Sequence, residues 1–326
     1  MGKNLLKKKL FIKKNVKYNM KTTEITDYKK AVENIREALK SYIQENNIKS
    51  LILGVSGGID SALCAALARP VCDELEIELI GRSITIHSNK EDEIERAREI
   101  GKNFCHNFLE ISMMREFILL NGNLNPSTND DSQKSIDYKI RAGNIKARLR
   151  MIHLYNLAHQ TKGMVLSTDN FTELLLSFFT LHGDVGDYGM IQNVWKTEVY
   201  DMARYIAQTE FSIEAKKALL KCADASATDG LGITDTDLDQ ILPDWKTRHN
   251  DTENGYGEVD NILKEYLILK MQVTEVPFVY EIEEDLFKER EERFEELKQN
   301  PVIKRMLKTE FKRNNPYNIT REEILE

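Results

Sequence analysis

One short segment of the chain combines residue types that bind a polyphosphate, namely Ser56-Gly57-Gly58-Ile59-Asp60-Ser61. It follows an apolar run typical of a buried strand and precedes an Ala/Leu-rich stretch typical of a helix, so it is expected to turn into a helix N-terminus. The N–H groups and positive dipole end of such a turn bind phosphate, and adjacent glycines let the backbone approach the anion. The two serines add hydroxyl donors, and the aspartate can hold a metal ion against the same phosphates. The lysine of a Walker loop is missing at its usual spacing, which indicates a phosphate loop of another kind.

A second carboxylate of interest is Glu173, in a helix predicted from about Asn170 to Phe179. Its helix face is otherwise apolar, and a carboxylate there is unfavourable unless a cation pairs with it. A metal ion would serve that purpose. The histidines are isolated along the chain, and no Cys/His or Ser/His pattern indicates a covalent nucleophile.

Strands and helices that could position these residues alternate along the chain. Strands are predicted at 50–55, 77–84, 104–111 and 163–167, and helices at 28–47, 61–68, 90–102, 138–159 and 170–179. This alternation predicts an α/β fold with an open, mainly parallel sheet and helices on both faces. A polar, turn-rich segment at 121–136 has the length of a mobile lid.

Three regions are expected from these patterns. Residues 1–20 are rich in lysine and predict a basic flexible arm. Residues 21–242 hold the sheet domain, and residues 243–326 predict a helical extension in which the acidic stretch 281–299 forms part of a helical hairpin.

Composition excludes several classes of protein. With 41% hydrophobic and 30% charged residues, 6 prolines and 16 glycines in 326 residues, the chain is neither collagen-like nor largely disordered. A balance of 46 basic against 53 acidic residues gives a net charge of −7 and does not favour nucleic-acid binding. No apolar run approaches the roughly 20 residues of a membrane helix, and the basic start lacks a signal-peptide core. The four cysteines form no CxxC pair, so a cytoplasmic protein without structural zinc or disulfides is expected.

The glycine-rich segment resembles the SGGxDS loop of the N-type ATP pyrophosphatases, which include NAD, GMP and asparagine synthetases and tRNA thiolases. Further segments, in the same order, resemble the NAD synthetases and imply their Rossmann-like, adenine nucleotide alpha-hydrolase-like fold. These are 143–151 for GNxxARxRM, 167–184 for GTDxxxExxxGxFTxxGD, 196–199 for K-T-x-V, 231–242 for LGxxYxxIDxxL and 309–316 for TExHKRxxP.

The resemblance implies roles for individual residues. Asp60 and Glu173 would coordinate Mg²⁺ and, with Lys196, form the catalytic set. ATP or pyrophosphate would be bound by Ser56, Gly57, Gly58, Asp60, Ser61, Arg148, Thr168, Lys196 and Ser226. Deamido-NAD would be bound by Asn144, Asp184, Lys312 and Arg313, and the last two would reach the site of the partner in a homodimer.

The implied reaction is an ammonia-dependent NAD synthesis. ATP adenylates deamido-NAD, pyrophosphate leaves, and ammonia attacks the acyl-adenylate to give NAD and AMP. About 50 residues precede the ATP loop, too few for a glutaminase domain, so ammonia is either free or delivered by a separate glutaminase partner. Two alternatives remain, another N-type ATP pyrophosphatase acting as an amidotransferase or ligase, and a nucleotide-binding regulator without catalysis.

The chain also departs from the family pattern. Ala225 replaces the proline of the P-[ST]-A loop, His182 and Phe311 replace a tyrosine and a histidine, and the region 243–308 is longer than expected. These departures fall on the acceptor pocket rather than on the adenylation residues.

Overall fold

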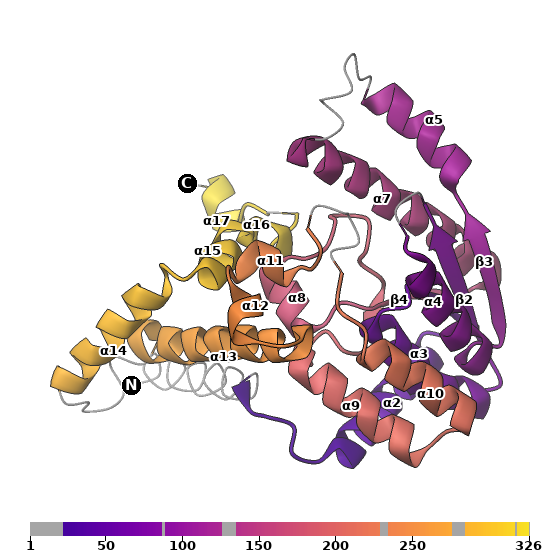
Figure 1. Cartoon of the computed structure of the whole chain (residues 1–326), viewed down its shortest axis with the longest axis horizontal. Coiled ribbons are helices and arrows are strands. Elements are labelled where there is room, and N and C mark those ends of the chain that lie inside the picture. Colours follow the sequence, from indigo (N-terminus) through magenta and orange to yellow (C-terminus); the bar gives the residue numbers. More distant parts are fainter. Residues whose placement is uncertain are drawn as a thin grey trace.

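The computed structural model describes residues 22–86, 89–125, 135–228, 234–275, 284–316 and 318–325 (Figure 1). Within them, five parallel strands form one sheet in the order β3-β2-β1-β4-β5. The strands are β1 (Ser50–Gly54), β2 (Glu78–Thr85), β3 (Asn107–Ser112), β4 (Met164–Ser167) and β5 (Tyr188–Gly189). The predicted open parallel sheet is therefore confirmed.

The central strand β1 is apolar along its length because both of its faces are covered. It pairs with β2 on one side, with Leu51 opposite Leu79, and with β4 on the other, with Leu51 opposite Met164. The chain order along the sheet reverses between β1 and β4. In open α/β sheets ligands bind at the carboxyl ends of the strands flanking such a reversal, and the glycine-rich turn leaves β1 at that end.

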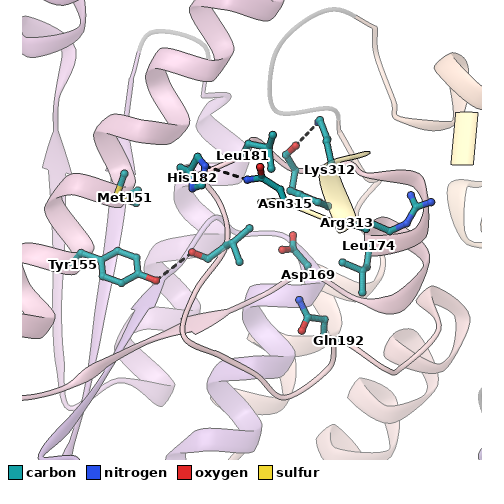
Figure 2. A pocket seen from close by; sticks show the side chains of 12 residues that line it. Met151, Tyr155, Asp169, Leu174, Leu181, His182, Gln192, Lys312, Arg313 and Asn315 are labelled. Atoms are coloured by element: carbon teal, nitrogen blue, oxygen red, sulfur yellow. Dashed lines mark hydrogen bonds between the residues drawn. The ribbon is translucent and has the colours of Figure 1, made fainter. Parts of the chain in front are cut away.

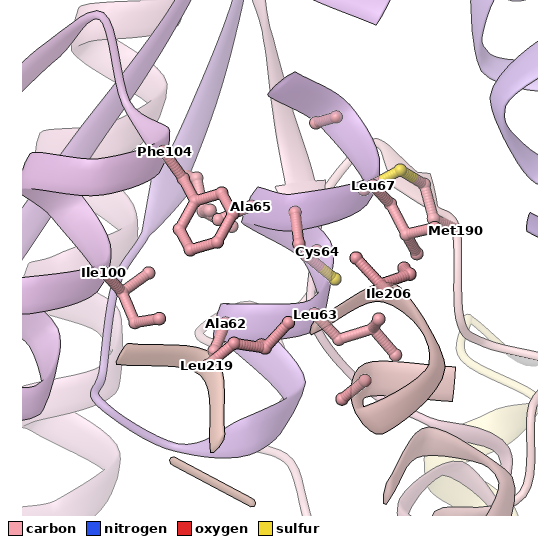
Figure 3. Close-up of a cluster of buried hydrophobic side chains, with 14 of the residues drawn as sticks. Ala62, Leu63, Cys64, Ala65, Leu67, Ile100, Phe104, Met190, Ile206 and Leu219 are labelled. Carbon is pink, nitrogen blue, oxygen red and sulfur yellow. The ribbon is translucent and has the colours of Figure 1, made fainter. Parts of the chain in front are cut away.

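One face of the sheet carries α2 (Tyr28–Glu45), α3 (Ile59–Glu74), α4 (Glu91–Phe104), α9 (Lys196–Thr209) and α10 (Ile213–Ala223). Their apolar side chains form the largest core cluster around α3, whose residues Ala62 to Ala68 are all fully buried (Figure 3). The other face is covered by the long α7 (Ile136–Thr161), against which α5 (Met114–Leu124) packs. Helices on both faces confirm the predicted layer order.

The C-terminal extension is helical, as predicted. By packing it begins earlier than the expected residue 243, at α11 (Leu238–Ile241), whose apolar side chains belong to the same core cluster as those of α13. It continues with α12 (Trp245–Arg248), α13 (Thr252–Lys270), a π-helical turn (Met271–Glu275), α14 (Glu284–Leu297), α15 (Pro301–Lys308), α16 (Glu310–Arg313) and α17 (Arg321–Leu325). The extension lies at the end of the molecule away from β3, and α8 (Phe171–Leu176) and α9 lie between it and the sheet (Figure 1).

A second core cluster joins this extension to the sheet domain. Leu238, Tyr256 and Leu263 of the extension are fully buried against Phe171 and Trp195, at the starts of α8 and α9. Tyr266 of α13 stacks on Phe294 of α14 at 5.1 Å between ring centroids, which fastens the predicted hairpin. The extension therefore packs directly on the two helices that carry Glu173 and Lys196.

Several boundaries differ from the sequence expectations. Phe104 ends α4 rather than starting a strand, and α8 stops at Leu176 because Ser177 turns into the left-handed region with φ of 53°. Residues 121–124, the start of the segment predicted as a lid, belong to the helix α5, and Ile136 at its end begins α7. Residues 126–134 of that segment, and the predicted arm at 1–20, lie outside the described residues. No helix in the described part of the chain is long and apolar enough to span a membrane.

Candidate active site

The turn between β1 and α3 has the backbone conformation and the donors predicted for a phosphate cradle. Gly57 has a φ of +86°, and a Cβ there would lie 2.2 Å from the carbonyl oxygen of Glu93, so a side chain is excluded. The hydroxyls of Ser56 and Ser61 lie 3.1 Å apart, the Ser61 hydroxyl donates to the Gly58 carbonyl, and the Gly58 N–H donates to Ser56. No side chain caps the start of α3. Both hydroxyls and the first N–H groups of the helix therefore gather at one anion-binding turn.

Three residues far apart in the sequence meet beside this turn. Lys196, the first residue of α9, is only 2% exposed. Its Nζ lies 2.5 Å from Oδ2 of Asp60 in α3 and 2.9 Å from Oε1 of Glu173 in α8. The ammonium group also faces the rings of Tyr200 and Tyr256 at 6.0 Å and 5.4 Å from their centroids. The structure thus brings together the catalytic set predicted from the sequence.

A capping box fixes the two carboxylates relative to one another. Asn170 caps α8, because its Oδ1 accepts the Glu173 N–H at 3.0 Å and Glu173 Oε2 accepts the Asn170 N–H at 3.4 Å. The same asparagine donates from Nδ2 to Asp60 Oδ1 at 2.8 Å. One side chain therefore sets the start of α8 and the distance between α8 and the glycine-rich turn.

The site is electrostatically demanding. Burial raises the pKa of Glu173, and the charge of Asp60 raises it further, whereas Lys196 opposes both effects. Burial alone would lower the pKa of Lys196, but the two carboxylates hold it well above its ordinary value. The ammonium is thus held charged against two carboxylates, one of which is shifted toward its neutral form.

Asp169 is a further acidic residue here, to which the sequence analysis gave no role. It is the second residue after β4, is 7% exposed, and accepts a hydrogen bond from the Ser167 hydroxyl at 3.3 Å. Burial and then the charge of Glu173 raise its pKa well above the ordinary value. Its position after Thr168 at the carboxyl end of a central strand was the available signal.

Asp60 and Glu173 are the candidate ligands for magnesium. No group of three or more His, Cys, Asp or Glu side chains able to hold a metal occurs among the described residues. Asp60 and Glu173 supply two carboxylates, and Mg²⁺ is commonly held by one or two carboxylates together with substrate phosphates and waters. Their convergence on one cation beside a phosphate cradle fits a metal that arrives with a nucleotide.

A cavity of about 510 Å³ lies next to this site (Figure 2). It is mainly apolar, with a few polar side chains that come from α7, from the segment after α8 and from α16. Its lining residues are Met151, Tyr155, Asp169, Leu174, Phe179, Leu181, His182, Val185, Gln192, Lys312, Arg313 and Asn315. A cavity of this size and lining suits an organic ligand.

Two basic residues at the edge of the cavity belong to this chain's own site. Lys312 donates to the carbonyls of Phe179 at 2.6 Å and Ser177 at 3.1 Å, and Arg313 donates to the carbonyl of Leu175 at 2.5 Å. These carbonyls lie at the C-terminal end of α8, where cations are favoured. Within this chain both charges line the cavity, and their expected reach to the site of a partner stays a prediction.

Three further predicted residues shape the cavity wall. The Thr180 N–H donates to Asp184 Oδ2 at 2.8 Å, and the Thr180 hydroxyl donates to Asn144 Oδ1 at 3.0 Å. Arg148 donates from Nε and Nη2 to the Leu181 carbonyl, both at 3.3 Å. These contacts fix the turn after α8; contacts of Asn144, Asp184 and Arg148 with substrate stay predictions.

The two remaining predicted residues are Thr168 and Ser226. Thr168 is half-buried at the end of β4, and Ser226 is exposed in the segment after α10. Two residues beyond Ser226, the Thr228 hydroxyl donates to Glu93 at 2.9 Å, and Glu93 also contributes the carbonyl that faces Gly57. The loop of Ser226 is therefore tied to the segment that closes over the glycine-rich turn.

Sequence reasoning missed one buried carboxylate, Asp260 of α13. It is 1% exposed and bonds to Thr172 and Thr197, the neighbours of Glu173 and Lys196. The signal was present, because residues 256–263, YGEVDNIL, fit the YxxIDxxL part of the family pattern with both tyrosine and aspartate. The segment 231–242 lacks that tyrosine. The end of the family pattern therefore fits α13 better, and the residues by which this chain exceeds the pattern lie before α13.

Comparisons with known proteins agree with this geometry. A family profile described as NAD synthase matches residues 31–276. The NH(3)-dependent NAD(+) synthetase of Finegoldia magna is 31% identical over 217 residues, 66% of this chain and 85% of that protein. The enzyme of the same name from Mycoplasma genitalium is 34% identical over 221 residues, 67% of this chain and 84% of that protein.

Solved structures share the fold. The NMN synthetase of Francisella tularensis superposes with a TM-score of 0.64 at 20% identity, covering 91% of this chain and 99% of that one. The NH3-dependent NAD synthetase of Campylobacter jejuni, in complex with a nitrate ion, gives a TM-score of 0.57 at 19% identity, covering 90% and 100%. Both likenesses include most of the helical extension.

Proposed function

This chain belongs to the NAD synthase family, and we propose from that premise that it is a ligase that amidates deamido-NAD with ammonia, using ATP as co-substrate. ATP adenylates the nicotinate carboxylate, pyrophosphate leaves, and ammonia displaces AMP. The observation that carries this proposal is the meeting of Asp60, Glu173 and Lys196 beside the glycine-rich cradle. Such a site positions a triphosphate and stabilises charge on the departing pyrophosphate, without a covalent nucleophile.

The cradle and the carboxylates divide the work on ATP. The backbone at Gly57 and Gly58 and the hydroxyls of Ser56 and Ser61 bind phosphate oxygens. Asp60 and Glu173 would hold Mg²⁺, and the bound ion would disperse charge on the leaving pyrophosphate. The ammonium of Lys196 adds a fixed positive charge at the same place. We propose that Thr168, Arg148 and Ser226 complete the ATP site.

The cavity beside the cradle is proposed as the acceptor site. Asn144 and Asp184 shape its wall through Thr180, and Lys312 and Arg313 bring positive charge to its edge. A nicotinate-bearing nucleotide is an anion with a flat ring, which suits an apolar cavity with basic residues at its rim. The Francisella tularensis protein of the same fold is described as an NMN synthetase. The corresponding acid, nicotinic acid mononucleotide, is therefore a second acceptor to test.

We propose a homodimer from apolar side chains that are exposed on β3, α5 and α7, away from the helical extension (Figure 1). Leu109 on the edge strand β3, Ile118 and Leu119 on α5, and Ile152 on α7 are each more than half exposed. Apolar groups gathered on an edge strand and neighbouring helices are typical of surfaces covered by a partner. We further propose a cytoplasmic location, which the four free, buried cysteines favour. The three-part division at 20 and 242 remains our proposal for its domains.

Release of AMP tests the proposal directly. Purified protein is incubated with ATP, Mg²⁺, ammonium and either deamido-NAD or nicotinic acid mononucleotide, and each component is omitted in turn. We expect AMP and the amidated product to form in equal amounts, only in the complete mixture, with deamido-NAD preferred. Turnover with the mononucleotide but not with deamido-NAD would make the mononucleotide the assigned substrate. Absence of AMP with either acceptor would refute the ligase assignment.

A further inference from the structure

The buried carboxylate Asp260 comes from the helical extension and ends between the two helices of the active site. Its Oδ1 accepts the Thr172 hydroxyl at 2.6 Å. Its Oδ2 accepts both the backbone N–H of Thr197 at 3.0 Å and the Thr197 hydroxyl at 2.9 Å. Only 1% of its surface is exposed, so these three donors, rather than water, provide the hydrogen bonds of the carboxylate.

Each of these donors adjoins a residue of the catalytic set. Thr172 precedes Glu173 in α8, and Thr197 follows Lys196 at the start of α9. The Thr172 hydroxyl also accepts the backbone N–H of Lys196 at 3.0 Å. Asp260 thus satisfies N–H groups at the start of α9 from outside the helix, directly through Thr197 and through the Thr172 hydroxyl at Lys196.

The same helix also faces the lysine ammonium. Tyr256 lies one turn before Asp260 on α13, and its ring centroid is 5.4 Å from Lys196 Nζ. The backbone at Lys196 and its side-chain tip are therefore both in contact with α13 or with groups bonded to it. Since Nζ must reach Asp60 and Glu173 at once, a small shift of α9 against α8 would break one of the two ion pairs.

We propose that Asp260 is a positioning residue for adenylation, which fixes α9 against α8 so that the Lys196 ammonium meets both Asp60 and Glu173. Asp260 does not touch the reacting atoms and acts through Thr172 and Thr197. The proposal rests on the proposed function. It gives the helical extension a part in the chemistry, since its helix α13 supplies the carboxylate that aligns the catalytic lysine.

Asp239 provides a matched control within the same extension. This carboxylate accepts the indole N–H of Trp245 at 2.9 Å and the backbone N–H of Thr236 at 3.0 Å. It pairs with Lys246 as well. All three partners lie in the segment before α13. Asp239→Asn therefore disturbs the extension without touching the α8–α9 contact.

The experiment compares Asp260→Asn with Asp239→Asn in the full chain. The amide keeps the size of the side chain but cannot accept three hydrogen bonds in the native arrangement. We expect Asp260→Asn to lower kcat about 10–100-fold, the usual range for residues that orient a reactive group, while the KM for deamido-NAD stays within about threefold. Asp239→Asn is expected to keep the kcat of the wild type, even where its Tm falls by as much as the Tm of Asp260→Asn.

Thr197 offers a second pair of variants that leaves the carboxylate in place. Thr197→Val removes one donor without changing the shape of the side chain, and Thr197→Ser restores it. A loss of kcat in the valine variant that the serine variant recovers supports positioning through this hydroxyl. The pair remains informative where Asp260→Asn does not fold.

The outcomes separate this proposal from the function it depends on. A wild-type chain that releases no AMP with either acceptor refutes the proposed function. Positioning is refuted instead where the wild type is active and the folded Asp260→Asn keeps its kcat, or loses no more than Asp239→Asn. Equal activities of Thr197→Val and the wild type would likewise refute the role of this hydroxyl and count against the proposal.

Discussion

Replacing Lys196 by methionine removes the buried cation that contacts both Asp60 and Glu173. The methionine keeps most of the apolar stem against Tyr200 and Tyr256, so the change is mainly one of charge. Removing one partner of a buried ion pair costs about 3–5 kcal/mol, because the other charge is left uncompensated. At about 2 °C per kcal/mol for a chain of this size, Tm should fall by about 6–10 °C.

The pH dependence of this loss has a definite sign. Lys196 lowers the pKa of Glu173, against the burial and the Asp60 charge that raise it. Without the lysine, that pKa rises further above its unfolded value, so the folded protein binds a proton that the unfolded chain does not. Protonation relieves the uncompensated charge, and the deficit in Tm should therefore be smaller at pH 5 than at pH 8.

Thermal unfolding of wild type, Lys196→Met and Lys40→Met measures this effect. Lys40 pairs with Glu74 at the surface, and losing such a pair costs about 0–1 kcal/mol. Millimolar Mg²⁺ should raise the Tm of Lys196→Met more than that of the wild type, since the cation replaces the missing charge. A Tm at pH 8 within about 2 °C of the wild type, or a deficit unchanged by pH, would refute the electrostatic account of this site.

Three further outcomes are expected. Glu173→Gln should keep its Tm, since Lys196 still pairs with Asp60 and glutamine also completes a capping box. Its AMP release should fall by about 10²–10³ with one preorganised charge removed. Excess Mg²⁺ should recover part of that rate, and near-normal turnover at low Mg²⁺ would contradict the metal assignment. Gly57→Ala should weaken ATP binding measured by calorimetry, because its Cβ would lie 2.2 Å from the Glu93 carbonyl oxygen, and added Mg²⁺ should not restore it. With the pure chain, turnover at fixed total ammonium should rise with pH, because neutral ammonia is the nucleophile; equal rates with glutamine would argue for a hidden glutaminase activity.

The cradle was predictable because its signals are local. The strand, the two glycines and the first turn of α3 lie within twelve residues of one another. The parallel sheet followed from the alternation of strands and helices along the chain, whereas the order of the strands within it did not. Asp60 and Glu173 could be paired in advance only through the resemblance to a family. Their separation is bridged in the fold by Asn170, whose amide group contacts both sides.

Features set by tertiary packing were not predictable in this way. Asp260 lies 88 residues from Thr172. The match of 256–263 to the family pattern singles the residue out, but no local pattern predicts that its carboxylate lies between α8 and α9. The end of α8 depends on a left-handed Ser177, whose hydroxyl and carbonyl are held by Arg313 and Lys312 from near the C-terminus. The sequence showed those two basic residues, but not that their side chains bind the carbonyls at the end of α8.

The buried cysteines offer an internal reporter of how the molecule opens. Cys64, Cys72, Cys105 and Cys222 are all free and buried, and burial raises the thiol pKa to about 12 in the last three. All four belong to the core around α3, and the extension has none. Since thiolate is the reactive form, alkylation by a small reagent must wait until the sheet domain unfolds. The rate of labelling therefore times that event alone, and comparing it with proteolysis of α13 to α15 would reveal whether the extension detaches first.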